Sequence, residues 1–280
     1  MVRPLLVRKS EPSLGVGVEL NQSNYEHLLI EKRDDGIAII TLNRPERMNA
    51  VNKAMHNELS RFARDAQADR SVRVVLLAGA GRAFCAGGDF STPEWANVDQ
   101  HHLEEGRQIV DNLLELQKPI VAAVHGYAFG IGATLSLLCD VVVAGRGAVF
   151  SDPHVKMALG AGDGGAVIWP MLMGVNRAKW FLMTGERITG DDLFDMGLVN
   201  FVVDDDEVMN KAMECATILV KGAPLALAAC KVPINLHLRS ISNLVLPLSM
   251  AMEGANTWSK DHAEAQAAFV EKREPVFRGE

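Results

Sequence analysis

The sequence lacks a long apolar run, a long basic run and any clustering of cysteines, and each absence excludes a class of protein. No apolar stretch is long and uninterrupted enough to span a bilayer, because the nearest candidate, residues 120–144, is broken by His125 and Asp140. The net charge of −7 argues against nucleic acid or an anionic membrane surface as a partner. The four cysteines form no CxxC pair and no metal-binding spacing, so we expect reduced thiols and no metal site.

The rest of the composition is that of an ordinary globular protein. The 280 residues are 48% hydrophobic and 22% charged, which is enough for one large core. The first residues make a poor secretory signal, since their short apolar portion is followed at once by charge, and we expect a cytoplasmic protein. Residues 1–23 show no clear periodicity and predict a flexible N-terminal arm.

The chain beyond this arm alternates strands and helices. Residues 27–43 predict two strands around the turn Asp35-Gly36. Further strands are predicted over 72–80, 120–126, 140–145 and 148–152, and helices over 52–69, 101–116 and 131–139. After about Lys179 the pattern is almost wholly helical. We therefore predict an α/β fold with a core over 24–200 and a C-terminal helical segment over 201–280.

Two loops share a design in which a strand ends in small residues and a turn follows. They are Ala83–Phe90 and His125–Thr134. Small residues let backbone N–H groups approach a ligand, and the second loop also opens a helix, whose first N–H groups lack partners. Together the loops could hold one developing negative oxygen, such as that of an enolate. The alternative is that the glycines only make tight turns.

These loops and their flanks resemble the crotonase (enoyl-CoA hydratase/isomerase) superfamily from about residue 25 to the C-terminus. The resemblance also includes ITLNRPERMNAVN and the tail beginning at Asp261. It implies the crotonase fold, a spiral of ββα units in two nearly perpendicular sheets. Its C-terminal helices would cover the site or a neighbouring subunit in a homotrimer or dimer of trimers. It also implies an acyl-CoA substrate, with coenzyme A as part of that substrate and no tightly bound cofactor.

Residue roles follow from the same resemblance. The backbone N–H groups of Gly88 and Ile131 would form the oxyanion hole, although the family usually has glycine at the second position. Lys272 would contact the nucleotide end of coenzyme A, or would be an ordinary solvated charge. The implied contacts with coenzyme A are Met48, Ala50, Ala86, Gly88, Phe269 and Lys272.

Thr134 and His154 stand where hydratases carry their two catalytic glutamates. A threonine hydroxyl does not ionise near neutral pH, and Thr134 is expected to bond its own helix. His154 can act as a general base. Asp163 could orient the imidazole of His154, or could cap the helix that follows.

The spacing from His154 to Asp163, together with Glu253, resembles a β-diketone hydrolase (6-oxocamphor-type) branch of the superfamily. That branch cleaves carbon–carbon bonds by a retro-Claisen step, but it has histidine at the position of Ile131. The preferred prediction is therefore hydrolytic cleavage of a β-dicarbonyl carried as a CoA thioester, with His154, Asp163 and Glu253 as catalytic residues. One alternative is an enoyl-CoA hydratase/isomerase of fatty-acid or related metabolism. A second is a catalytically silent acyl-CoA-binding subunit.

Overall fold

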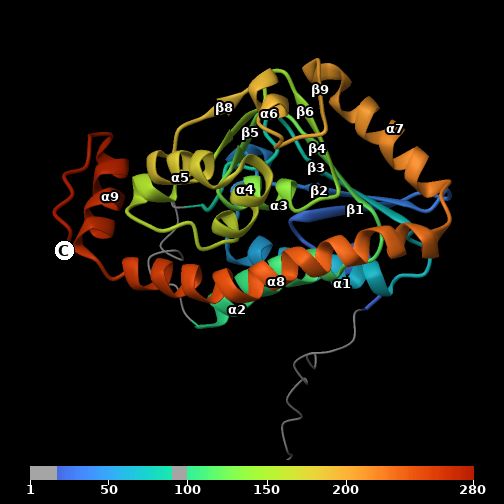
Figure 1. The fold of residues 1–280 in the computed structure, drawn as a ribbon, viewed down its shortest axis with the longest axis horizontal. Helices are drawn as coiled ribbons and strands as arrows, with labels where there is room; N and C mark the ends of the chain where they lie inside the picture. The colour runs from blue at the N-terminus through green and yellow to red at the C-terminus, as the bar shows by residue number, and fades with distance from the viewer. Residues whose placement is uncertain (1–17, 90–99) are drawn as a thin grey trace, which may run out of the picture.

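A six-stranded sheet and a three-stranded sheet form the frame of the molecule (Figure 1). This computed structural model describes residues 18–89 and 100–280. The large sheet has the order β1 (Leu28–Lys32), β2 (Ile37–Leu42), β3 (Val74–Gly79), β4 (Ile120–Val124), β6 (Val141–Gly145) and β9 (Phe201–Val203). The small sheet has the order β5 (Tyr127–Phe129), β7 (Val149–Ser151) and β8 (Ile188–Thr189). Both sheets, with helices around them, confirm the predicted crotonase-type α/β architecture.

The strand pairing follows from the local sequence. Strands β1 and β2 are antiparallel and meet at the predicted turn, where Gly36 has a φ of 91° that favours glycine. The remaining neighbours in the large sheet pair in parallel. Strands β3 and β4 are buried almost throughout, as expected of parallel strands covered on both faces.

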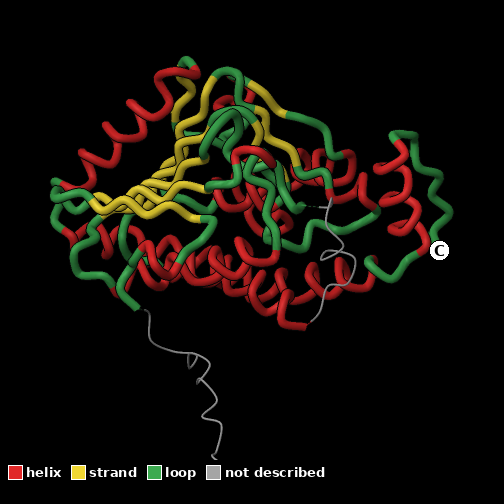
Figure 2. The backbone as a smooth tube through the Cα atoms, turned by 180° about the vertical axis from the view of Figure 1, so that it is seen from behind, coloured by secondary structure: helices red, strands yellow, loops and turns green. Residues whose placement is uncertain are grey.

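Helices cover both faces of the large sheet (Figures 1 and 2). Alternate side chains of β3 point to opposite cores, so that Val74 and Leu76 meet α7 (Val208–Val220) while Val75 and Leu77 join the larger core. The larger core includes residues of α1 (Lys53–Ala68), α2 (Gln100–Glu115) and α8 (Pro224–Asn256). Helix α2 packs against both α1 and α8.

Of the remaining helices, α5 (Val175–Thr184) and α9 (Lys260–Glu271) lie toward the end of the molecule that carries the C-terminus (Figure 1). The α-helices are α3 (Ile131–Leu137), α4 (Gly165–Met173), α5 (Val175–Thr184), α6 (Asp191–Asp195) and α9 (Lys260–Glu271). The 3-10 helices are η1 (Gln22–Asn24), η2 (Pro45–Arg47), η4 (His154–Met157) and η5 (Asp205–Glu207). Among the described residues no single helix is long and apolar enough to cross a bilayer. The segment 205–220 and helix α8 meet the length and apolarity required of a membrane span only when they are taken as a pair. The chain bends by 110° between them.

The structure differs from the sequence prediction at both ends of the chain. Strands β8 and β9 interrupt the region expected to be almost wholly helical, because two or three residues are too few to show a strand periodicity. Strand β9 lies in the predicted C-terminal segment but completes the large sheet beside β6. Part of the predicted N-terminal arm, residues 1–17, lies outside the described residues. Leu20 of that arm is fully buried.

Candidate active site

The loop after η2 is held in an uncommon backbone conformation. Met48 and Asn49 have φ values of 52° and 56°, in the left-handed region that residues other than glycine rarely adopt. Such a conformation costs roughly 1–2 kcal/mol per residue. The Asn49 side chain offsets this, since its amide Nδ2 donates to the carbonyls of Ala80 and Ala83 at 2.8 Å each. Its Oδ1 accepts a bond from the backbone N–H of Arg44 at 2.8 Å.

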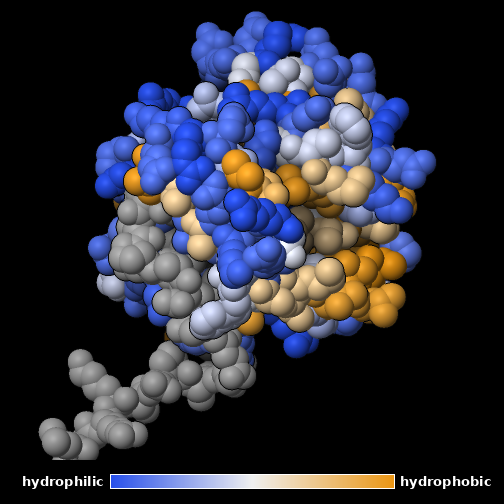
Figure 3. Space-filling model, turned by 90° about the vertical axis from the view of Figure 1, so that its left-hand side faces the viewer, coloured by the Kyte–Doolittle hydropathy of each residue, from blue (hydrophilic) through white to orange (hydrophobic). Residues whose placement is uncertain are grey.

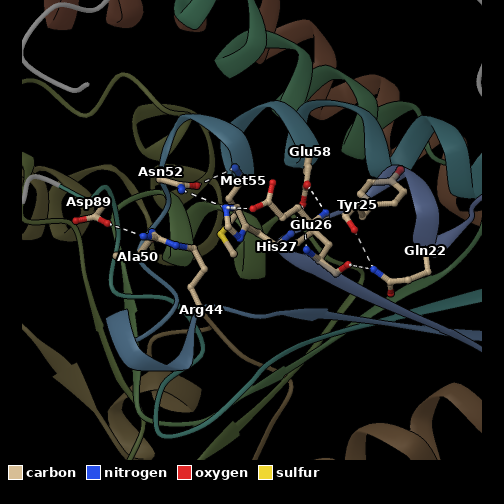
Figure 4. A network of polar contacts seen from close by, with 11 residues as sticks. Gln22, Tyr25, Glu26, His27, Arg44, Ala50, Asn52, Met55, Glu58 and Asp89 are labelled. Carbon is tan, nitrogen blue, oxygen red and sulfur yellow. Dashed lines mark hydrogen bonds and ion pairs between the residues drawn. The ribbon is translucent and has the colours of Figure 1, made fainter. Parts of the chain in front are cut away.

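Arg44 joins this loop to the next one (Figure 4). Its Nη2 lies 3.0 Å from Oδ2 of Asp89, and its Nη1 donates to the carbonyl of Ala50. Both charged side chains are largely buried, with exposed fractions of 12% and 5%. Breaking a buried ion pair costs several kcal/mol, so the ion pair fixes residues 48–50 against the segment that contains Gly88.

The two predicted oxyanion donors line one cavity. The Val51 N–H donates to the Gly87 carbonyl, and the Asp89 N–H donates to the Val51 carbonyl. In this parallel bridge, the N–H of Gly88 itself points to the side away from Val51. The second donor, Ile131, is the first residue of α3, so its N–H has no acceptor within the helix. The residue directly before it, Gly130, has a positive φ of 50°, whereas Ile131 itself has a helical backbone.

His154 begins η4 and lies among three carboxyl groups. Its Nδ1 bonds Oδ1 of Asp152, whose side chain is fully buried. Its Nε2 lies 3.7 Å from Oδ2 of Asp163 and 3.6 Å from Oε1 of Glu253 on α8. The structure therefore brings together all three residues predicted to be catalytic. It adds Asp152, which bonds Nδ1 of His154 and was not predicted, whereas Asp163 was the residue expected to orient the imidazole.

Asp163 lies between the start of α4 and the imidazole of His154. Its Oδ1 accepts a bond from the N–H of Gly165 at 3.3 Å, near the start of α4, while its Oδ2 faces His154. Within the described residues, Oδ2 is buried without a hydrogen-bond partner. Thr134 departs from its expected bond within α3, because its hydroxyl donates to Oδ1 of Asp163 at 3.1 Å. Thr134 thus donates a hydrogen bond to the carboxyl group of Asp163, whereas a glutamate at this position would itself be the carboxyl group.

Burial and mutual charge shift the proton affinities of this cluster. Burial disfavours the His154 cation, but the negative charges of Asp152, Asp163 and Glu253 more than offset it and raise the His154 pKa well above its usual value. Burial raises the pKa of Asp163, although the charge of His154 acts in the opposite sense. Burial also raises the pKa of Glu253 to about 7, against the same opposing effect. Near neutral pH the imidazole is thus a cation, and Glu253 gains or loses a proton easily.

Two adjoining cavities meet at Gly88 and His154. The inner cavity has a volume of about 70 Å³, and the outer groove about 720 Å³. Figure 3 shows hydrophobic residues gathered in one area of the end of the molecule on which α9 lies. The groove is lined by five of the predicted coenzyme A contacts, Met48, Ala50, Ala86, Gly88 and Phe269. The sixth, Lys272, is not among its lining residues and is the left-handed C-cap of α9.

Sequence analysis overlooked several residues of these cavities. His56 and His102 line the inner cavity beside Leu103, Gly106, Leu159, Met250 and Thr257. His56 and Glu105 lie on α1 and α2, which give no sign of facing each other until the helices are packed. The groove also carries cationic side chains that were not predicted as contacts, namely Arg47, Lys156, Arg187 and Arg273.

Two groups of side chains bring potential metal ligands together. Within each group the ligand atoms lie within 4.8 Å of one another. In the first, His56, His102 and Glu105, the two rings stack with centroids 4.0 Å apart, so their in-plane lone pairs do not converge on one ion. In the second, Asp152, His154 and Asp163, the ring Nδ1 already bonds Asp152. The geometry therefore assigns no metal to either group.

Residues 32–280 match the family model described as enoyl-CoA hydratase/isomerase, and the chain belongs to this family. It is 32% identical over 248 residues to the short-chain-enoyl-CoA hydratase of Clostridium acetobutylicum, covering 88% of this chain and 95% of that protein. An enoyl-CoA hydratase/isomerase structure from Mycobacterium paratuberculosis has a TM-score of 0.82 and 32% identity over 86% of this chain and 97% of that one.

A second similar structure is a β-diketone hydrolase from the cyanobacterium Anabaena, bound to (S)-3-oxocyclohexyl acetic acid. It has a TM-score of 0.78 and 28% identity, covering 84% of this chain and 96% of that one. The fold and the family membership are thus shown, and the chain is a crotonase-family enzyme. The hydratase relatives favour the alternative function over the preferred carbon–carbon hydrolase.

Proposed function

We propose that this enzyme hydrates or isomerises a short enoyl-CoA thioester. The observation that carries the proposal is the position of His154 between Asp163 and Glu253, where the groove meets the inner cavity. Although Thr134 and His154 replace the usual glutamates, Asp163 and Glu253 supply two other ionisable carboxyl groups next to the oxyanion donors. Hydration needs one group that takes a proton and one that gives it.

The groove fits coenzyme A in size and charge. Its volume of about 720 Å³ falls within the range of small-molecule sites. Cationic side chains on its wall would attract phosphates, and apolar residues such as Met48, Ala50 and Phe269 would contact the pantetheine arm. The thioester would then lie at the junction, within reach of the N–H groups of Gly88 and Ile131. Donors of this kind stabilise an enolate oxygen, and losing one typically costs about 3–4 kcal/mol.

The proton movements balance over one hydration. Glu253 takes a proton from water, the resulting hydroxide adds to the β-carbon, and the thioester oxygen becomes the enolate oxygen. The imidazolium of His154 then donates a proton to the α-carbon, which converts the enolate into the hydrated thioester product. Glu253 is then protonated and His154 neutral, and one proton crossing the 3.6 Å between Oε1 and Nε2 restores both groups. The acidic role assigned to His154 follows from its raised pKa and differs from the base expected from the sequence.

Hydrolytic carbon–carbon cleavage of a β-dicarbonyl is the second candidate. It is supported by the bond between Asp152 and Nδ1 of His154, which leaves Nε2 facing the inner cavity as in a water-activating pair. The similarity to the Anabaena hydrolase supports it further. In this reaction water would add to the ketone, and the bond to the α-carbon would break. The leaving carbanion would become the enolate at Gly88 and Ile131.

A paired turnover assay tests both candidates. Purified protein is given crotonyl-CoA in one arm, and a cyclic β-diketone or a 3-oxoacyl-CoA in the other. Crotonyl-CoA turnover that falls roughly 10²–10⁴-fold in His154→Ala, but not in His237→Ala on the exposed side of α8, supports the proposal. Diketone or 3-oxoacyl cleavage without crotonyl-CoA turnover supports the second candidate. Binding without turnover in either arm contradicts both and leaves an acyl-CoA-binding subunit.

We also propose that the chain assembles as a homotrimer or a dimer of trimers. Helix α8 exposes a series of large apolar side chains, including Leu225, Leu236, Leu244 and Leu248. Exposed apolar surface of this extent is typical of a subunit interface. Light scattering during size-exclusion chromatography should give a mass of three or six chains, and a monomer would contradict the proposal.

A further inference from the structure

Two stretches that are far apart in the sequence meet at the acid–base cluster. We call the bend between α8 and α9, residues 253–262, the corner, and residues 154–162 the η4 segment. The corner contributes Glu253 to the mechanism above, and the η4 segment contributes His154, at a distance of 3.6 Å between Oε1 and Nε2. Two further hydrogen bonds join the same two stretches and take no part in that mechanism.

The first of these bonds comes from Asn256, the last residue of α8. Its Oδ1 accepts a bond from the backbone N–H of Gly160 at 3.2 Å. Two residues further on, the backbone of the η4 segment packs directly on Glu253. An added Cβ at Gly162 would overlap Oε2 of Glu253 and would lie 2.8 Å from its Cβ. A shift of the corner would therefore move the η4 segment as well.

The second bond comes from His262, whose side chain is buried in the first turn of α9. Its Nδ1 lies 2.7 Å from the carbonyl oxygen of Met157, the last residue of η4. A carbonyl oxygen only accepts, so Nδ1 carries the proton and donates it. The opposite ring nitrogen, Nε2, lies 3.0 Å from Nε2 of Gln266. The imidazole is thus held from both sides, and one side is the backbone of η4.

Helix α9 packs on the body of the enzyme chiefly through η4. Its buried residues Ala265 and Ala268 belong to neither of the two apolar cores formed by the described residues. The chain after α9 folds back on that helix, where Asp261 accepts the backbone N–H groups of Arg278 and Gly279. The bond from His262 to η4 is therefore an important part of what places α9 and η4 relative to each other.

We propose that Asn256 and His262 are positioning residues that hold His154 at the distance from Glu253 that proton transfer requires. The inference rests on the proposed function, in which one proton passes between these two groups. Both positioning residues bond backbone atoms, one on each side of Ala158, where the chain has a φ of 55°. A misplacement of reacting groups by 1 Å can cost about 10²-fold in rate.

The test compares two substitutions of His262 in the full chain. His262→Leu removes the donor, whereas His262→Asn keeps one, because its amide nitrogen is as many bonds from the backbone as Nδ1. The kcat for crotonyl-CoA should fall roughly 10–10²-fold in His262→Leu, and His262→Asn should restore most of it. Lys260→Gln breaks the exposed ion pair between α9 and Glu280 and should keep kcat. An equal loss in Lys260→Gln would overturn the inference, because a general loosening of α9 would then suffice.

Nuclear magnetic resonance titration of the His154 ring provides a readout that a merely structural role would not change. The negative charge of Glu253 is one of the causes that raise the His154 pKa, so a ring that moves away should titrate at lower pH. We expect this shift in His262→Leu and not in His262→Asn. A fall in kcat with an unchanged titration would overturn the inference.

Asn256→Leu tests the same inference at the other bond and covers the case in which His262→Leu does not fold. It removes the acceptor of the Gly160 N–H, and it should lower kcat and shift the His154 titration in the same directions. Unchanged values of both in Asn256→Leu would contradict the positioning role. A natural chain that does not turn over crotonyl-CoA would contradict the proposed function, and the titrations would still decide whether His154 is held by the corner.

Discussion

Oε1 of Glu253 lies 3.6 Å from Nε2 of His154, and the two residues come from α8 and η4, which are far apart in the sequence. This contact places an ionisable carboxyl group beside an imidazole that Asp152 already holds from its other nitrogen. The acid–base chemistry of the site therefore depends on where α8 ends. That dependence makes Glu253 the first residue to test.

Glu253→Gln should abolish the rise of turnover with pH. The pKa of Glu253 is raised to about 7, and a carboxylate that takes a proton from water must be ionised. Turnover of the natural chain should therefore increase as pH rises through about 7. In the variant it should fall roughly 10²–10⁴-fold at pH 8. Steady-state rates from pH 5.5 to 9 check this, with Glu214→Gln on the remote helix α7 as control. An unchanged profile in Glu253→Gln would assign the base to another group.

The same substitution should stabilise the fold at alkaline pH. A carboxyl group with a raised folded pKa contributes stability that is fully present below its unfolded pKa and is lost as pH rises through the folded pKa. For Glu253, the window runs from about 4.5 to about 7. At pH 8, Glu253→Gln should exceed the natural chain in unfolding free energy by up to about 3 kcal/mol, while at pH 4.5 the two should be similar. Urea titrations at both pH values measure the difference. Equal stability at pH 8 would mean that Glu253 ionises without penalty.

Asp152→Asn should move the alkaline limb of the pH–rate profile to lower pH. Asp152 is the first of the three carboxyl groups that raise the pKa of His154, so removing its charge makes the imidazolium easier to deprotonate. Nuclear magnetic resonance titration of the His154 ring checks the cause directly. A profile that moves without any change in this titration would place the effect elsewhere.

Gly130→Ala should impair catalysis beyond its effect on folding. Gly130 has a φ of 50°, and an added Cβ would lie 3.3 Å from Cε1 of His154. Gly174 has a φ of 84° but nothing within 4 Å of an added Cβ, so Gly174→Ala is a matched control for backbone strain. Both variants should lose roughly 1–3 kcal/mol of stability, because both glycines have backbone conformations that other residues rarely adopt. Only Gly130→Ala should lower kcat, and equal kcat losses in both would show that strain alone is responsible.

Tyr25→Phe should weaken the fold and leave catalysis intact. The Tyr25 hydroxyl donates to Oδ2 of Asp65 at 2.7 Å, and both side chains are buried. A hydrogen bond to a charged group contributes about 1.5–3 kcal/mol. Chemical denaturation should show a loss of that size, while kcat and KM stay within twofold. A large change in kcat would indicate a link from the end of η1 to the active site that no contact of Tyr25 explains.

The main strands and helices of this molecule could be predicted from the sequence, because elements longer than about five residues show their own hydrophobic periodicity. The hairpin at Gly36, helix α1 and strand β3 were all predicted in this way. Gly88 and Ile131 were predicted to be oxyanion donors from the resemblance of their loops to those of the family, and the structure places both on the wall of one cavity. Strands β8 and β9, with two and three residues, are too short to show a periodicity of their own.

The rest of the site depends on contacts between distant segments. Asp152 ends a predicted strand, and nothing in its neighbourhood marks it as the partner of His154. Thr134 was expected to bond its own helix, whereas its hydroxyl reaches Asp163. The pairing of His56 with Glu105 requires the packing of α1 on α2. These relationships exist only after the chain has folded.

The proposed oxyanion donors and the proposed acid–base groups come from separate parts of the chain, and this separation bears on how such enzymes diverge. Gly88 and Ile131 are fixed by the sheet and α3, while Glu253 is contributed by the far end of a surface helix. If the proposed roles hold, substitutions in α8 can replace the proton-transferring group without disturbing the enolate site. A lineage could change its reaction by altering one helix. An engineer could follow the same route, retaining the thioester frame and choosing new residues for the last turns of α8.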